Sequence, residues 1–79
     1  MYHGVTHVQA ADGYRLLLCF DNGEHRIFDV TPLLDTGRFA ELKNPELFKT
    51  VAVSFDTIEW KNGLDLDPEY LYAKSVGAS

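Results

Sequence analysis

The chain has 79 residues, of which 46% are hydrophobic and 24% are charged, and its formal net charge is −5. This length leaves room for one domain, residues 1–79, and the composition is that of a globular protein rather than a disordered tail. Cys19 is the only cysteine, which excludes an internal disulfide and fits a reducing compartment. Because so small a core supplies only about 3–5 kcal/mol of net stability, a binding partner is the expected supplement.

The acidic charge argues against direct binding to nucleic acid. The seven lysines and arginines are scattered with no two adjacent, whereas nucleic-acid binders usually gather them on one face. Residues 1–4 lack the basic and apolar regions of a signal peptide. The longest apolar run, residues 16–20, is too short to span a membrane. We therefore expect a cytoplasmic protein without membrane contact.

Turn signals in the first third of the chain predict an antiparallel meander. The dipeptides Asp-Gly at 12–13 and Asn-Gly at 22–23 favour two-residue hairpin loops, because these residues tolerate a positive φ. They bracket three candidate strands at residues 5–10, 14–20 and 24–30.

With two-residue loops, Leu18 would lie opposite Ile27 and Val8 opposite Leu17. The middle strand is apolar on both faces in this register, which is typical of a central strand covered on two sides. Helices would provide one cover, and the second hairpin or a second subunit would provide the other.

The three prolines follow a threonine, an asparagine and an aspartate, which are helix-capping residues. They predict helices at residues 32–35, 45–50 and 68–76, of which only the last is substantial. Between the last two, residues 51–55 alternate as a half-buried strand does, and 58–60 return after a turn. The predicted fold class is α+β: a three-stranded antiparallel meander plus a second short hairpin, with short helices and a C-terminal helix.

Residues 60–72, which read WKNGLDLDPEYLY, resemble the C-terminal signature of the bacterial domain of unknown function 2442. The hairpin of alternating Tyr14, Leu16, Leu18 and Phe20 before Asn-Gly is similar to the N-terminal pattern of that family. The spacing of apolar residues over 39–48 is similar to its middle. Lys61 departs from the proline or glutamate that is frequent at its position.

This resemblance implies an α+β fold and a cytoplasmic bacterial protein, and it implies no reaction, because the family has no assigned catalytic residues. Some relatives carry a helix-turn-helix domain after this one. Many short members look like one half of a two-protein operon of the toxin–antitoxin kind.

Histidines and the cysteine are the candidates for a metal site or a nucleophile. His3, His7 and His25 could gather, but the chain has no cysteine pair and no His-Glu-x-x-His motif. Cys19 would gain thiolate character from Arg26 across the strand, yet it lies in the most apolar strand, where a cysteine usually packs as a small hydrophobe. We predict no catalytic residue, no metal site and no cofactor.

A carboxylate cluster at Asp65, Asp67 and Glu69 could bind calcium or magnesium, but it lacks the regular loop of an EF-hand. The simpler interpretation is that Asp67 caps the last helix and the other carboxylates meet the positive end of the helix dipole.

Aromatic residues near the C-terminus are the candidates for a binding surface, since Trp and Tyr dominate interface hot spots. Trp60 more often anchors a small core. Tyr70 and Tyr72 flank Leu71 on a helix and cannot all face inward, which makes the last helix the best interface candidate. The predicted interface residues are Trp60, Tyr70, Tyr72, Leu16, Leu18 and Phe20.

These observations predict a non-enzymatic protein-interaction or regulatory module, of which the antitoxin-like half of a two-protein operon is one form. The partners left open are a second copy, as a homodimer, and a protein encoded nearby. The alternative is a small-molecule sensing domain related to those fused to DNA-binding domains, which needs an apolar pocket with a few polar groups.

Overall fold

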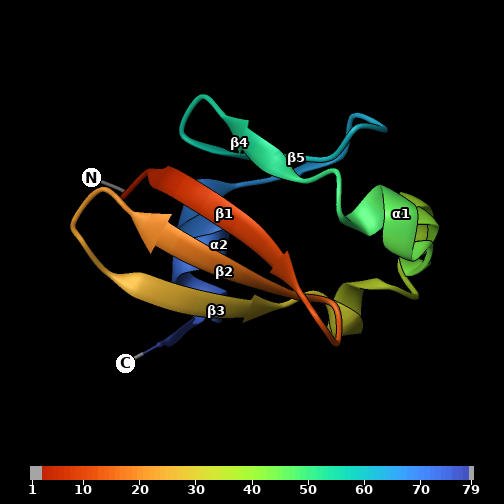
Figure 1. Ribbon diagram of the computed structural model, residues 1–79, viewed down its shortest axis with the longest axis horizontal. Coiled ribbons are helices and arrows are strands. Elements are labelled where there is room, and N and C mark those ends of the chain that lie inside the picture. The colour runs from red at the N-terminus through yellow and green to blue at the C-terminus, as the bar shows by residue number, and fades with distance from the viewer. Residues whose placement is uncertain (1–2, 79) are drawn as a thin grey trace.

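A meander of three antiparallel strands begins the fold, as the turn signals predicted. The computed structural model describes residues 3–78. Strands β1 (Val5–Ala11), β2 (Arg15–Phe20) and β3 (His25–Asp29) lie side by side, and the short β7 (Val76–Gly77) adds to β3 in the order β1-β2-β3-β7 (Figure 1). The C-terminal end of the chain therefore returns to the sheet that its N-terminal part forms.

The predicted second hairpin is also present. Strands β4 (Ala52–Ser54) and β5 (Thr57–Glu59) pair antiparallel, and the two-residue β6 (Asp65–Leu66) pairs with β5. The α+β fold class is thus confirmed. The strands β6 and β7 were not predicted, because two residues are too few for an alternating pattern.

Within residues 3–78, four short helices connect and cover these sheets. They are the 3₁₀ helices η1 (Thr31–Leu33) and η2 (Gly37–Lys43) and the α-helices α1 (Pro45–Phe48) and α2 (Pro68–Lys74). The prediction missed η2 altogether and placed the ends of α1 and α2 two residues too late.

Two of the three predicted caps are confirmed. The Asn44 side chain accepts a hydrogen bond from the Glu46 amide at 3.0 Å, and the Asp67 side chain accepts one from the Glu69 amide at 2.8 Å. The third prediction was wrong, because Val30 and not Thr31 occupies the N-cap position of η1. The Asp29 side chain accepts a hydrogen bond from the Thr31 amide at 2.9 Å instead.

The predicted strand register was wrong by one residue, because both loops of the meander have three residues. In the second loop the Phe20 amide bonds the Glu24 carbonyl, and Gly23 takes the left-handed position with a φ of +87°. As a result Leu18 lies opposite Arg26, not Ile27. A shift of one residue moves each partner to the other face of the sheet.

In the first loop Gly13 and Tyr14 both have a positive φ, of +79° and +58°. Strand β1 is therefore also displaced by one residue from its predicted register, so that Val8 lies opposite Leu18 and Gln9 opposite Leu17.

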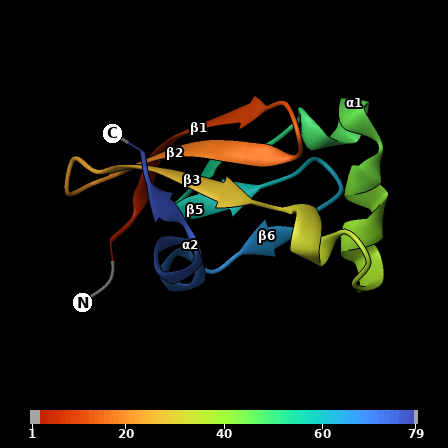
Figure 2. The same ribbon diagram turned by 90° about the horizontal axis from the view of Figure 1, so that it is seen from below.

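The core lies on the inner face of the meander. Leu16, Leu18 and Phe20 of β2 are at most 2% exposed, and they pack with the hydrophobic residues of the second sheet and of α2. Figure 2 shows α2, β5 and β6 on this side of the meander, while no described element lies on its outer side. The two faces of β2 thus have different environments, and among the elements of residues 3–78 only the inner face is covered.

Candidate interaction surfaces

An apolar row crosses the outer face of the four-stranded sheet. Leu17 is the register partner of Ile27, and Ile27 is the register partner of Val76. Leu17 is 40% exposed and Val76 is 63% exposed, while Ile27 is half-buried between them. We call Leu17, Ile27 and Val76 the outer row. The run of apolar residues in β2 gave a signal for Leu17, but Val76 was predicted to end the last helix and was missed.

A polar row lies beside the outer row on the same face. His7 and His25 are the register partners of Cys19 on its two sides, and the Cys19 Sγ lies 3.3 Å from the His25 Nδ1. Across residues 3–78 no group of three or more His, Cys, Asp or Glu side chains is placed to hold a metal ion.

The predicted pairing of Cys19 with Arg26 was wrong, because the register shift places Arg26 opposite Leu18. The cross-strand neighbour that the Cys19 side chain contacts is instead His25.

Arg26 instead joins the end of α2 to the sheet. Its Nε donates to the Ser75 Oγ and its Nη2 donates to the Ser75 carbonyl, both at 2.7 Å, and its Nη1 bonds Glu24 at 2.9 Å. The guanidinium lies over the ring of Tyr72, 4.6 Å from its centroid, in a cation–π contact. The Tyr72 hydroxyl donates to Glu24, and this bond holds the pKa of the Glu24 carboxyl below its ordinary value.

The predicted interface residues separate into two groups. Four have side chains at most 2% exposed, so they belong to the core and are not available at the surface: Trp60, Leu16, Leu18 and Phe20. Trp60 donates its Nε1 hydrogen to the Phe48 carbonyl at 3.1 Å, as expected of a core anchor.

The other two residues lie on α2. Tyr70 is 37% exposed, and its ring meets that of Phe28 edge-on with centroids 5.9 Å apart. Tyr72 is half-buried and is held by the contacts with Glu24 and Arg26. An interface role for these two tyrosines stays a prediction.

The tip of the β4–β5 hairpin carries the most exposed large apolar side chain of the described chain. Phe55 is 98% exposed, and Val53, which lies in strand β4 of the same hairpin, is 38% exposed. The alternating pattern predicted that Phe55 would lie with Val53 on the apolar face of a half-buried strand, which was wrong. Ser54 pairs with Thr57, so the turn consists of Phe55 and Asp56, and the strand ends before Phe55.

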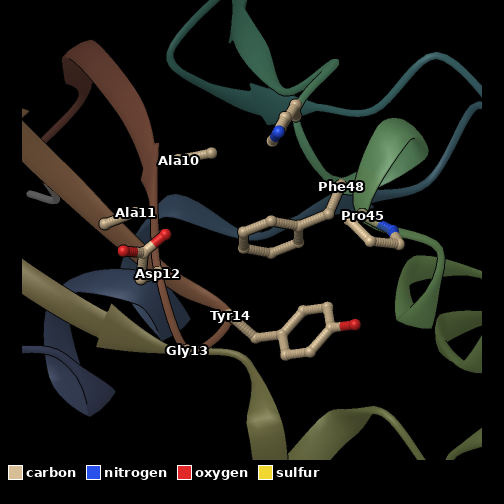
Figure 3. A pocket seen from close by; sticks show the side chains of 8 residues that line it. Ala10, Ala11, Asp12, Gly13, Tyr14, Pro45 and Phe48 are labelled. Atoms are coloured by element: carbon tan, nitrogen blue, oxygen red, sulfur yellow. The ribbon is translucent and has the colours of Figure 1, made fainter.

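A pocket opens between the β1–β2 loop and α1 (Figure 3), with a volume of about 280 Å³. Its lining is mainly apolar and includes one acidic and one basic residue. The lining residues are Ala10, Ala11, Asp12, Gly13, Tyr14, Pro45, Phe48 and Lys49.

Tyr14 forms a fixed wall of this pocket. Its hydroxyl donates to the Lys43 carbonyl, and its ring packs edge-on against Phe48 with centroids 5.2 Å apart. These contacts hold Tyr14 at a φ of +58°, a conformation that a non-glycine residue seldom adopts.

Asp67 is engaged in the helix cap, and among residues 3–78 neither Asp65 nor Glu69 forms a metal-binding group with it. No helix among the described residues has both the length and the apolar character needed to cross a membrane.

Comparison with curated proteins finds no match, and comparison with solved structures finds none either. The pattern of one protein family, described as "Protein of unknown function (DUF2442)", matches residues 5–77. The match covers both sheets, the pocket and α2, including the segments in which the resemblance was noted from the sequence. The chain therefore belongs to the DUF2442 family.

Proposed function

We propose that this chain is a non-enzymatic protein-interaction module that binds a protein partner through the outer row. The observation that carries the proposal is the exposure of Leu17, Ile27 and Val76 side by side on a sheet face that no described element covers. Single exposed apolar residues are normal on a protein surface, whereas adjacent ones that form a patch are typical of binding sites. Burial against a partner would remove this patch from water, which is the main favourable term in association.

The size of the chain allows such an interface. A standard interface buries about 800 Å² on each partner, and the described surface totals 4873 Å². The interface area is a small fraction of this surface, so the outer face of one sheet is large enough to supply it. The net charge of −5 favours a partner with a basic surface, because opposite charges accelerate encounter and exclude wrong partners.

The finer form of the proposal is an antitoxin-like or regulatory half of a two-protein system, with the partner encoded in a neighbouring gene. It is supported by the resemblance that relates short family members to such operons and by the acidic charge. The proposal that the outer row is a docking surface does not depend on which gene encodes the partner, or on a bacterial, cytoplasmic setting.

The test is co-expression with the product of the adjacent gene and measurement of the complex at micromolar concentration. Leu17→Lys places a charge within the outer row, beside Ile27, and we expect it to abolish co-purification. Val53→Lys is the matched control, since Val53 is exposed to a similar degree, 38% against 40%, but lies on the other sheet. The proposal is wrong if Leu17→Lys binds as the unmodified chain does, and its two-protein form is wrong if no complex forms.

A second candidate is a small-molecule sensing domain, which the pocket beside Tyr14 favours. Its volume of about 280 Å³ lies just below the roughly 300–1,000 Å³ of pockets that hold small ligands. We therefore rank this function second. A thermal-shift screen with small aromatic acids, chosen to match the apolar walls and the Lys49 ammonium, tests it, and the absence of any shift at millimolar ligand counts against it.

A further inference from the structure

Phe55 combines two unfavourable features that the fold itself does not require. Its ring is 98% exposed, and its φ is +57°. Asp56, the second residue of the turn, is not among the described residues with a positive φ, so the turn follows the type II′ pattern, in which glycine is the usual first residue. Glycine would relieve the backbone and would expose no apolar ring to water.

Strained backbone costs free energy that the rest of the fold must compensate, and such strain is concentrated at functional sites. The exposed ring of Phe55 on a strained turn therefore indicates a functional position. Nothing is gained inside the chain, because a ring that is 98% exposed has almost no packing contacts. Phenylalanine has the size and rigidity of an interface anchor, and an anchor of this kind needs a matching pocket on the surface to which it binds.

The chain itself carries a pocket of suitable size and chemistry. The pocket beside Tyr14 has a volume of about 280 Å³ and mainly apolar walls. It is small for a metabolite but large enough for one aromatic side chain. The rings of Tyr14 and Phe48 already meet edge-on in its wall, 5.2 Å apart, and a third ring could join them in the same geometry.

The ring and the pocket lie at opposite ends of β1. The Val5 amide at the start of β1 bonds the Asp56 carbonyl in the hairpin tip at 2.8 Å, whereas Ala10 and Ala11 at the end of β1 line the pocket. Six residue steps of a strand span about 20 Å, so Phe55 cannot reach the pocket of its own chain. Two copies related by a two-fold axis across β1 would place each ring near the pocket of the other.

We propose that two copies of this chain form a reciprocal dimer in which Phe55 of each copy fills the pocket between the β1–β2 loop and α1 of the other. A two-fold pair of identical contacts closes on itself, so association stops at the dimer. Neither the hairpin tip nor the pocket includes Leu17, Ile27 or Val76. The dimer is therefore independent of the outer row, and either proposal can fail alone.

The first experiment is sedimentation equilibrium over a concentration series up to about 1 mM, where even a dissociation constant of that size gives visible dimer. We expect a mass that approaches twice the chain mass of 8.9 kDa and does not exceed it. Phe55→Gly should weaken dimerisation about 30-fold or more, as the loss of a hot-spot side chain does. Val76→Ala, which also removes exposed apolar surface but lies outside both features, should dimerise as the unmodified chain does.

The second experiment separates the ring from the pocket. The Ala10 side chain points into the pocket (Figure 3), so Ala10→Phe fills the pocket with a ring of the same chain and should also prevent dimerisation. Phe55→Gly keeps its pocket and Ala10→Phe keeps its exposed ring. An equimolar mixture should therefore form a mixed dimer through one of the two contacts, weaker than the unmodified dimer and stronger than either variant alone.

Several outcomes would overturn the proposal. These are a monomer throughout the concentration series, growth beyond the dimer, unchanged dimerisation of Phe55→Gly or of Ala10→Phe, and a mixture that associates no better than its components. Far-ultraviolet circular dichroism of each variant verifies that it is folded, and Phe55→Gly provides the test if Ala10→Phe fails to fold, because it alters no buried side chain.

Discussion

Replacing Phe55 by glycine should stabilise the folded monomer, although it removes the largest side chain of the hairpin. Almost no packing is lost, since the ring is 98% exposed, and a backbone held at a φ of +57° is relieved. Strain of this kind costs about 1–3 kcal/mol at a non-glycine residue. The greater freedom of glycine in the unfolded chain offsets about 0.5–1 kcal/mol of that gain.

The net expectation is an increase of about 1 kcal/mol in the free energy of unfolding. For a domain of this size such an increase raises Tm by about 4–8 °C. Thermal and urea unfolding, followed by circular dichroism, measure it. The lowest workable protein concentration is used, because self-association stabilises the native state by mass action.

Phe20 provides the matched control, because it is the same residue type at 2% exposure. Phe20→Ala should cost about 3–5 kcal/mol through lost burial and the cavity that remains. The reasoning is refuted if Phe55→Gly lowers the stability of the monomer by 1 kcal/mol or more, because that loss would mean that the ring packs within the chain.

Three further changes test the remaining contacts. Asp67→Ala leaves the Glu69 amide without its acceptor and should cost about 1 kcal/mol in urea unfolding, whereas Asp65→Ala, which caps nothing, should cost much less. Trp60→Phe should cost about 1–3 kcal/mol for the unsatisfied carbonyl alone, and an unchanged urea midpoint would contradict the buried bond. Tyr72→Phe removes the hydroxyl that holds the pKa of Glu24 below its ordinary 4.5. A carboxyl with a lowered pKa in the folded state contributes stability above its unfolded pKa and loses it as the pH falls through the folded pKa. Urea unfolding of the variant should therefore show a smaller loss of stability as the pH falls below about 4.5 than the unmodified chain shows.

Local chemistry determined the starts of α1 and α2 and the number of main strands. Asn44 and Asp67 cap their helices because a capping side chain needs only the amide two residues ahead, which the sequence places within reach. The alternation of Leu16, Leu18 and Phe20 likewise identified one face of β2, and that face is the core.

Register depended on a choice that the turn residues leave open. Asp-Gly and Asn-Gly suit both a two-residue loop and a three-residue loop with glycine in the left-handed position, and the fold uses the longer loop twice. The difference is one residue, yet it moved Ile27 to the outer face beside Leu17 and turned Arg26 away from Cys19.

The candidate surfaces could be located only from the tertiary structure, because they too depend on which strands pair and in which register. The sequence indicated that β2 is apolar on both faces, which includes Leu17, but it could not say which face the chain leaves open. Val76 reaches the outer row only because α2 ends at Lys74 and the chain turns back onto β3, a contact between residues 49 positions apart. The periodicity of apolar residues shows which side of a single helix or strand is buried. Which distant segments pair, and in which register, is decided by the packing of the whole chain.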